Sequence, residues 1–155
     1  MNETILKVNY LIEGIISTIP TKMIYEQSKE NELSNIHFEI NFGKHNIKSK
    51  TCNAIEYATV CLQKALPANI SIACCQSCRY GNFCPYGDAD NEIFCLKNVI
   101  PRDKEDVCTF FAENRENLED RTRKLLDFCK EYKPMADNKY YTYNDWEYNL
   151  THYKR

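Results

Sequence analysis

The chain has 155 residues with 20 basic and 22 acidic side chains, a net charge of −2. This length favours one domain with a real core, and a hydrophobic fraction of 43% excludes a disordered or fibrous chain. The missing basic excess argues against nucleic-acid binding, and no apolar run reaches the roughly 18 residues of a membrane span. The interrupted apolar N-terminus does not resemble a signal peptide, so we expect a cytoplasmic microbial protein.

Residues 1–50 are predicted to form mainly sheet. Residues 35–42 alternate between apolar and polar side chains, as a half-buried strand does, and 43–46 is a turn candidate before a hairpin return. Residues 22–26 are a second strand candidate. Residues 4–19 fit either one amphipathic helix or two strands broken near Gly14, and periodicity alone does not decide between them.

A helix is predicted over residues 51–66. Thr51 is a candidate N-cap, and Pro67 ends the helix. The apolar stripe includes Cys52, and Cys61 lies on a flank of small residues. We interpret both cysteines as buried small apolar side chains.

A second helix is predicted over residues 114–133. Its start is acidic and its end is basic, an order that suits the helix dipole. Leu118, Leu125, Cys129 and Tyr132 would form its buried stripe, and Pro134 would end it. The aromatic tail, residues 134–155, would be a docked strand or short helix, or else a face that binds a partner.

The chain has 9 cysteines, which is high for a protein with no secretory signal, and this favours metal binding or redox chemistry over disulfides. Cys75 and Cys78 have the Cys-x2-Cys spacing that lets two thiolates converge on one ion. Cys95 and Cys108 each follow a change of chain direction and are the best distant pair. The predicted site is therefore a structural zinc held by Cys75, Cys78, Cys95 and Cys108.

Cys84 is the alternative ligand. The spacing Cys75-x2-Cys78-x5-Cys84 is similar to the start of the cysteine run in the auxiliary-cluster domain of radical SAM maturases. That pattern continues with a cysteine four residues later, where this chain has Asp88. An iron–sulfur cluster is therefore the alternative cofactor. Adjacent Cys74 and Cys75 are not expected to share one ion, because consecutive side chains diverge.

The stretch AIEYATVCLQKALPANISIACCQSCRYGNFCPYGDADNEIFCLK resembles the signature of an uncharacterised bacterial family of small Cys-x2-Cys proteins. The matching features are Leu66-Pro67, the Cys75–Cys78 pair with Arg79-Tyr80, the Pro85-x-Gly87 turn and Cys95. The resemblance covers the chain from about residue 52 to residue 111. It implies that Cys84 is dispensable, which favours the set with Cys108, and it brings no activity.

Together these segments predict an α+β fold, a single domain of residues 1–155 in which a small N-terminal antiparallel sheet packs on two helices, with a cysteine-rich metal module at 74–111. The three histidines, His37, His45 and His152, are scattered and are interpreted as surface residues. Asp88, Asp90 and Glu92 are interpreted as a solvated loop. There is no phosphate-binding loop and no nucleophile elbow.

The expected function is therefore non-enzymatic. A zinc-stapled protein of this size and acidity would bind a protein partner, as an adaptor or as an immunity protein that neutralises a toxin. The first alternative is an iron–sulfur or thiol redox protein. The second is an enzyme with a cysteine nucleophile.

Overall fold

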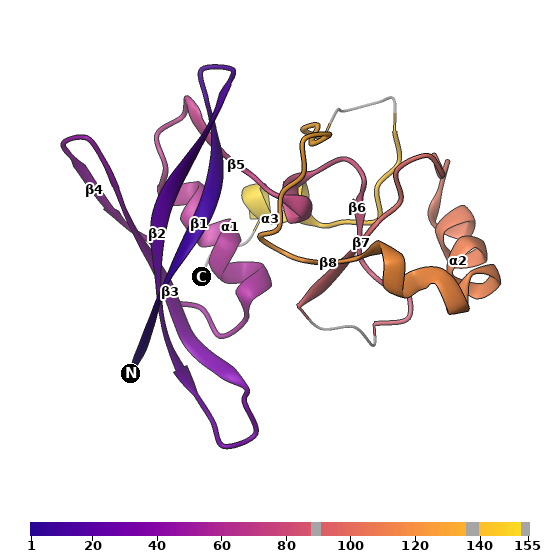
Figure 1. Ribbon diagram of the computed structural model, residues 1–155, viewed down its shortest axis with the longest axis horizontal. Coiled ribbons are helices and arrows are strands. Elements are labelled where there is room, and N and C mark those ends of the chain that lie inside the picture. The colour runs from indigo at the N-terminus through magenta and orange to yellow at the C-terminus, as the bar shows by residue number, and fades with distance from the viewer. Residues whose placement is uncertain (88–90, 136–139, 153–155) are drawn as a thin grey trace. The chain divides into compact units, whose positions relative to one another are not determined.

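The computed structural model describes residues 1–87, 91–135 and 140–152. The chain forms two compact units (Figure 1). Unit 1 comprises Met1–Ile72 and Trp146–Arg155, and unit 2 comprises Ala73–Asp145. The division places the whole cysteine-rich segment predicted at 74–111 in unit 2 rather than in a loop of the N-terminal sheet.

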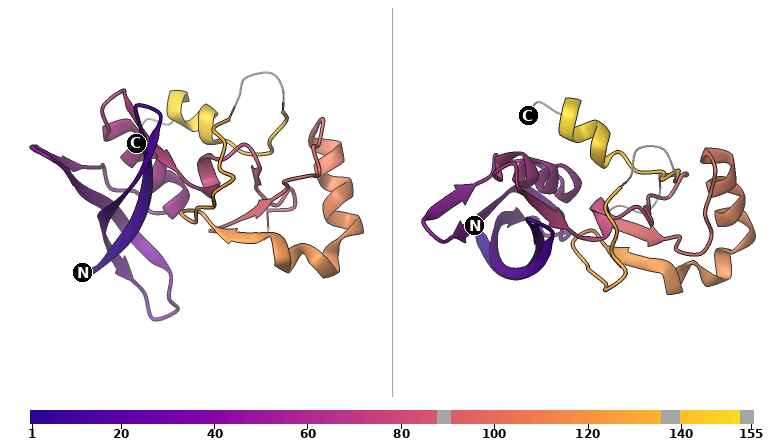
Figure 2. Two further views of the ribbon diagram at one scale, coloured as in Figure 1. Left: turned by 45° about the horizontal axis from the view of Figure 1, so that its top comes forward. Right: turned by 90° about the horizontal axis from the view of Figure 1, so that it is seen from above.

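Unit 1 is built on a five-stranded sheet with the strand order β4-β3-β2-β1-β5. Strands β1 to β4 are joined in sequence by antiparallel pairing. The strands are β1 (Asn2–Ile12), β2 (Ile15–Gln27), β3 (Leu33–Phe42), β4 (His45–Lys48) and β5 (Ile70–Ala73). The two longest strands twist strongly, so that the sheet curls (Figure 2, right).

The first of these hairpins settles the ambiguity of residues 4–19, which form two strands and no helix. Glu13 and Gly14 join β1 to β2, and their φ angles of 50° and 85° are both positive. Two consecutive positive φ values define the tight hairpin turn whose twist matches that of the strands. The predicted strand at 22–26 is the second half of β2, and the predicted strand and return at 35–50 are confirmed by β3 and β4.

One face of this sheet carries the core of unit 1. The alternation predicted for residues 35–42 is confirmed, since Ile36, Phe38 and Ile40 are buried. Tyr10 of β1 is also buried, and its hydroxyl lies 2.6 Å from the Thr21 hydroxyl. That contact satisfies a polar atom that would otherwise be costly to bury.

The helix predicted at 51–66 is present but begins later, as α1 (Ile55–Ala65). Thr51 does not cap it. Instead Cys52 pairs with Ile36, with backbone N–H···O distances of 2.7 and 2.8 Å in the two directions, and this holds the chain extended before the helix. The end before Pro67 is confirmed, because Leu66 is already extended. Helix α1 packs against β3, β4 and α3 (Trp146–His152).

Among its described residues, unit 2 contains a small antiparallel sheet of order β6-β7-β8, one α-helix and two 3-10 helices. Its elements are η1 (Cys75–Ser77), β6 (Gly81–Asn82), β7 (Glu92–Cys95), α2 (Lys104–Glu113), η2 (Arg115–Arg121) and β8 (Thr122–Lys124). Its apolar cluster consists of Phe94, Leu96, Val107 and Phe111, with the two phenylalanine rings edge to face at 5.1 Å.

The predicted helix at 114–133 is wrong. Helix α2 ends at Glu113, a 3-10 helix covers 115–121, and the chain then turns into strand β8. Tertiary contacts override the local charge pattern here, because Arg121 donates hydrogen bonds to the carbonyls of Cys95 and Lys97 at 2.9 and 3.3 Å. No helix among the described residues is long and apolar enough to cross a membrane.

Candidate metal centre

The Cys-x2-Cys segment folds as one tight turn. After Cys74, the residues Cys75–Ser77 form a 3-10 turn in which the Cys78 N–H donates to the Cys75 carbonyl at 3.3 Å. The Gly81 N–H then donates to the Cys78 carbonyl at 2.9 Å. Two consecutive turns of this kind present both thiols from one short stretch of chain, as the Cys-x2-Cys spacing predicts.

Residues 125–133 run alongside this turn and are bonded to it at three points. The N–H groups of Cys75, Gln76 and Arg79 donate to the carbonyls of Asp127, Leu125 and Lys133, at 2.7, 3.0 and 2.9 Å. Because these bonds lie on both sides of residue 129, they bring the segment at 125–133, with Cys129, beside the Cys75–Cys78 turn.

Strand pairing brings a further thiol, that of Cys95, close to this turn. Gly81 of β6 lies opposite Cys95 of β7. The Leu96 N–H also donates to the Tyr80 carbonyl at 2.8 Å, which extends the pairing beyond the strands. Cys95 is the last residue of β7.

Four cysteines from these three segments line one pocket of about 490 Å³. They are Cys75, Cys78, Cys95 and Cys129. Five charged residues also line it, and two of these, Lys97 and Glu131, form an ion pair. The charged lining residues are Lys97, Asp120, Arg121, Arg123 and Glu131.

The thiols of the pocket influence each other's ionisation. Burial is the main cause that raises the pKa of Cys75, and negative charge on Cys74, Cys78 or Cys129 raises it further. Burial also raises the pKa of Cys78, as does negative charge on Cys95 or Cys129. Cys75 and Cys78 therefore resist ionising beside other thiolates, and a bound cation would remove that resistance because it compensates the thiolate charges.

The side chains of the four cysteines that line the pocket do not meet at a common point in the structure. Among the described residues, no three His, Cys, Asp or Glu side chains are arranged closely enough to hold a metal ion. All nine cysteines lie among the described residues, and they are thiols rather than halves of disulfides. The pocket is thus lined by four separate thiols rather than by a preformed ligand cage.

Three of the four predicted ligands line this pocket, and Cys108 does not. Cys108 lies on α2, where its carbonyl accepts a hydrogen bond from the Tyr86 hydroxyl at 3.3 Å. Cys84 is also absent from the pocket lining and packs against the apolar cluster of α2 and β7. Cys74 is fully buried, with a pKa that burial raises to about 11.

Cys129 was missed by sequence reasoning, which assigned it to the buried stripe of a helix. That assignment is wrong, since the helix is absent and Cys129 is exposed. One feature of the sequence argues against a buried position for Cys129, namely the residues next to it in the chain. Charged Asp127, Lys130 and Glu131 flank it, which is unusual for the centre of a buried stripe.

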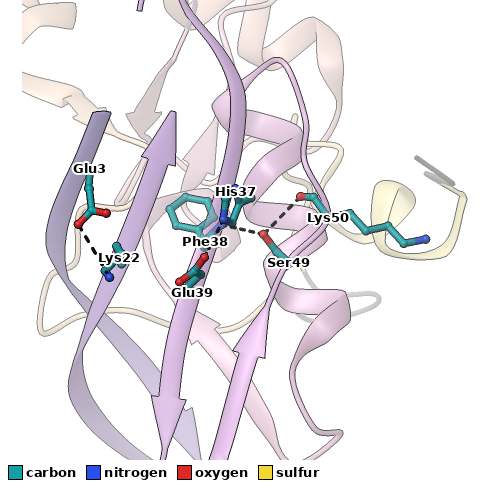
Figure 3. Close-up of polar contacts among 7 residues, drawn as sticks. All are labelled: Glu3, Lys22, His37, Phe38, Glu39, Ser49 and Lys50. Atoms are coloured by element: carbon teal, nitrogen blue, oxygen red, sulfur yellow. Dashed lines mark hydrogen bonds and ion pairs between the residues drawn. The ribbon is translucent and has the colours of Figure 1, made fainter. Parts of the chain in front are cut away.

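The histidines belong to unit 1 and supply no ligand to the thiol pocket. His37 and Glu39 lie side by side on the sheet face opposite Phe38, with 2.9 Å between Nε2 and Oε2 (Figure 3). The hydrogen bond from His37 is the main cause that lowers the pKa of Glu39. His45 and His152 are exposed, as predicted. In the predicted acidic loop, Asp88 and Asp90 lie outside the described residues.

No protein-family model matches the chain, and neither the curated proteins nor the solved structures contain a significant match to it. The resemblance to the family of small Cys-x2-Cys proteins therefore stays a prediction.

Proposed function

We propose that unit 2 holds a structural zinc ion through the thiolates of Cys75, Cys78, Cys95 and Cys129, and that the chain is a non-enzymatic binding protein. The observation that carries this proposal is the convergence of four cysteines from three segments on one pocket. The fourth ligand in this proposal is Cys129, whereas the sequence predicted Cys108.

Zinc suits this set of residues for chemical reasons. Thiolates are soft ligands that select zinc or iron–sulfur clusters, and a closed set of four is typical of structural sites. The proposed site requires the thiols to move inward, to Zn–S distances of about 2.3 Å. Rotation about χ1 is the natural motion, because each cysteine has three staggered positions for its sulfur atom.

The small size of the elements in unit 2 gives such an ion a structural role. Strand β6 has two residues and β8 has three, and the apolar cluster has four buried members. A zinc ion that joins the turn at 75–78, β7 and the segment at 125–133 would crosslink three pieces of chain and add to the few backbone hydrogen bonds that connect them. Its binding free energy would then be folding free energy.

The partner-binding part of the proposal concerns unit 1. Three large apolar side chains stay exposed on its first hairpin, Ile5, Ile15 and Ile16, with exposed fractions of 60, 69 and 40%. Exposed apolar side chains of this kind support a protein-binding role of the adaptor or immunity type. A negative charge introduced on the same hairpin, as in Ile15→Asp, would then abolish recovery of a partner from the native host.

The metal proposal is tested by elemental analysis of the untagged protein purified without oxygen. We expect one zinc per chain in the native protein and in Cys108→Ser. In Cys129→Ser we expect zinc affinity to fall by about 100-fold or more, because one of four covalent-like Zn–S contacts is lost. Competition with a chromogenic chelator measures that affinity in both variants.

The two serine variants form a matched pair, since both replace one cysteine in unit 2 and only one lines the pocket. Equal affinities in the two variants would refute the assignment of Cys129. Native protein with no bound metal would refute the site altogether. Iron with inorganic sulfide, and a brown colour, would replace zinc with the iron–sulfur alternative at the same residues.

A further inference from the structure

Unit 1 contains a second cysteine pair that the proposed zinc site does not use. The Sγ atoms of Cys52 and Cys61 lie 2.9 Å apart. This exceeds the disulfide bond length of about 2.05 Å by only about 0.9 Å.

The backbone on both sides of this contact is fixed. Cys52 is bonded to Ile36 of β3 through both its N–H and its carbonyl. Cys61 lies in the middle of α1, which packs against the same strand. Both cysteines are buried, with exposed fractions of 2 and 6%. The fold therefore holds two thiols face to face on rigid elements, which is the arrangement that favours bond formation between them.

We propose that Cys52 and Cys61 are a thiol oxidation site, which a small-molecule disulfide converts into an intramolecular disulfide. In the first step one protein thiolate attacks the small disulfide, forms a mixed disulfide and expels one small thiolate. In the second step the other protein thiol loses its proton and attacks the protein sulfur of the mixed disulfide, which expels the second small thiol. The protein loses two electrons and two protons, and one small disulfide becomes two small thiols.

The environment of the pair sets the rate of this reaction. Burial raises the pKa of Cys61 to about 12, and the hydrogen bond with Cys52 adds to the effect. Few thiolates exist at neutral pH, and a buried sulfur reacts only through local opening of the structure. The pair is therefore expected to respond to sustained oxidation rather than to brief exposure.

Proteolysis offers a direct assay, because the chain has no Lys or Arg between Lys50 and Lys64. Trypsin therefore releases residues 51–64, TCNAIEYATVCLQK, with both cysteines and no other thiol. The full chain is equilibrated in glutathione redox buffers at pH 8, quenched with acid, alkylated and digested. An internal disulfide removes about 2 Da from this peptide and blocks both alkylations.

The same equilibration in concentrated urea is the control for proximity in the unfolded chain. We expect the folded chain to reach half oxidation in a buffer at least tenfold more reducing than the unfolded chain requires. By linkage the disulfide would then favour the folded state by the same factor, about 1.4 kcal/mol for each factor of ten. In Cys52→Ser and Cys61→Ser the peptide should carry no internal disulfide.

A shift of less than tenfold between folded and unfolded chain, including none, would overturn the proposal. So would a folded chain whose 51–64 peptide keeps two alkylated thiols in buffers that oxidise the unfolded chain. Neither result depends on the zinc site, since both cysteines belong to unit 1 and neither lines the thiol pocket.

Discussion

Gly81 is the residue on which the turn of the candidate metal centre depends most directly. A Cβ atom at this position would lie 2.0 Å from the Cys75 carbonyl oxygen and 3.0 Å from the Ile93 side chain. The first of these neighbours is backbone within the Cys-x2-Cys turn, so it cannot move aside without displacing the thiols. The absence of a side chain is thus a steric requirement of the turn.

Gly81→Ala is therefore expected to destabilise the protein by about 3 kcal/mol, the upper end of the range for overpacking. It should also reduce zinc affinity, because the turn that carries Cys75 and Cys78 is distorted. Gly87→Ala is the matched control. It makes the same substitution at a position where, among the described residues beyond its chain neighbours, no atom lies within 4 Å of the added Cβ, and where the φ of +73° accounts for a cost of about 1 kcal/mol.

Urea unfolding of the two variants measures the difference. Equal losses of stability in Gly81→Ala and Gly87→Ala would show that the close approach at Gly81 is relieved by small shifts of the chain. The sequence could not reveal this role. It shows where glycines occur, but not which carbonyl approaches them in the folded chain.

At the level of elements, local pattern predicted the sheet of unit 1 better than it predicted unit 2. The alternation at 35–42 and Pro67 after α1 are local signals, and the structure follows both. The segment at 114–133 has an equally regular charge pattern, yet it forms η2 and β8. The difference is that this segment exchanges bonds with distant parts of unit 2, which a local pattern cannot show.

Arg121 makes several of these contacts with distant parts of unit 2. Its guanidinium donates to the carbonyls of Cys95 and Lys97, and it stacks over the Phe110 ring at 5.0 Å. Arginine suits such a position because its planar fork serves two acceptors and an aromatic face at once. The end of η2 is thereby attached to β7 and to α2.

Arg121→Ala is expected to destabilise the protein by about 2 kcal/mol, since hydrogen bonds from a charged donor and a cation–π contact are lost together. Arg115→Ala, at the exposed start of the same 3-10 helix, should change stability by less than about 0.5 kcal/mol. Chemical denaturation of both variants in the same buffer tests this. Losses of similar size would show that Arg121 does not anchor the segment.

At the level of the whole molecule, the sequence predicted the mixed composition of sheet and helix but not the division into two units. The reason is that the boundary at Ile72 and Ala73 falls inside strand β5, with no linker of glycine or proline to mark it. The cysteines that line the thiol pocket were predicted only in part for a related reason. Cys75, Cys78 and Cys95 lie close in sequence, whereas Cys129 reaches the pocket through pairing of distant segments.

The two units should respond differently to loss of metal. Unit 1 has an extended sheet with α1 packed on it and a core of large apolar side chains that includes Tyr10, Phe38 and Leu62. Unit 2 has strands of two to four residues and would depend on zinc for much of its stability. Chelation of the metal is thus expected to act on unit 2 first.

Hydrogen exchange measured by mass spectrometry, with and without a strong chelator under reducing conditions, resolves the units within one chain. After chelation, amides in β6, β7 and the turn at 75–78 should lose at least tenfold in protection, while those in β1, β2 and β3 keep theirs. Cys78→Ser should reproduce the chelated pattern without chelator, because a missing ligand and a missing metal have the same effect. Equal loss of protection in both units would mean that the chain unfolds as one cooperative body, and unchanged protection in unit 2 would mean that its fold does not depend on zinc.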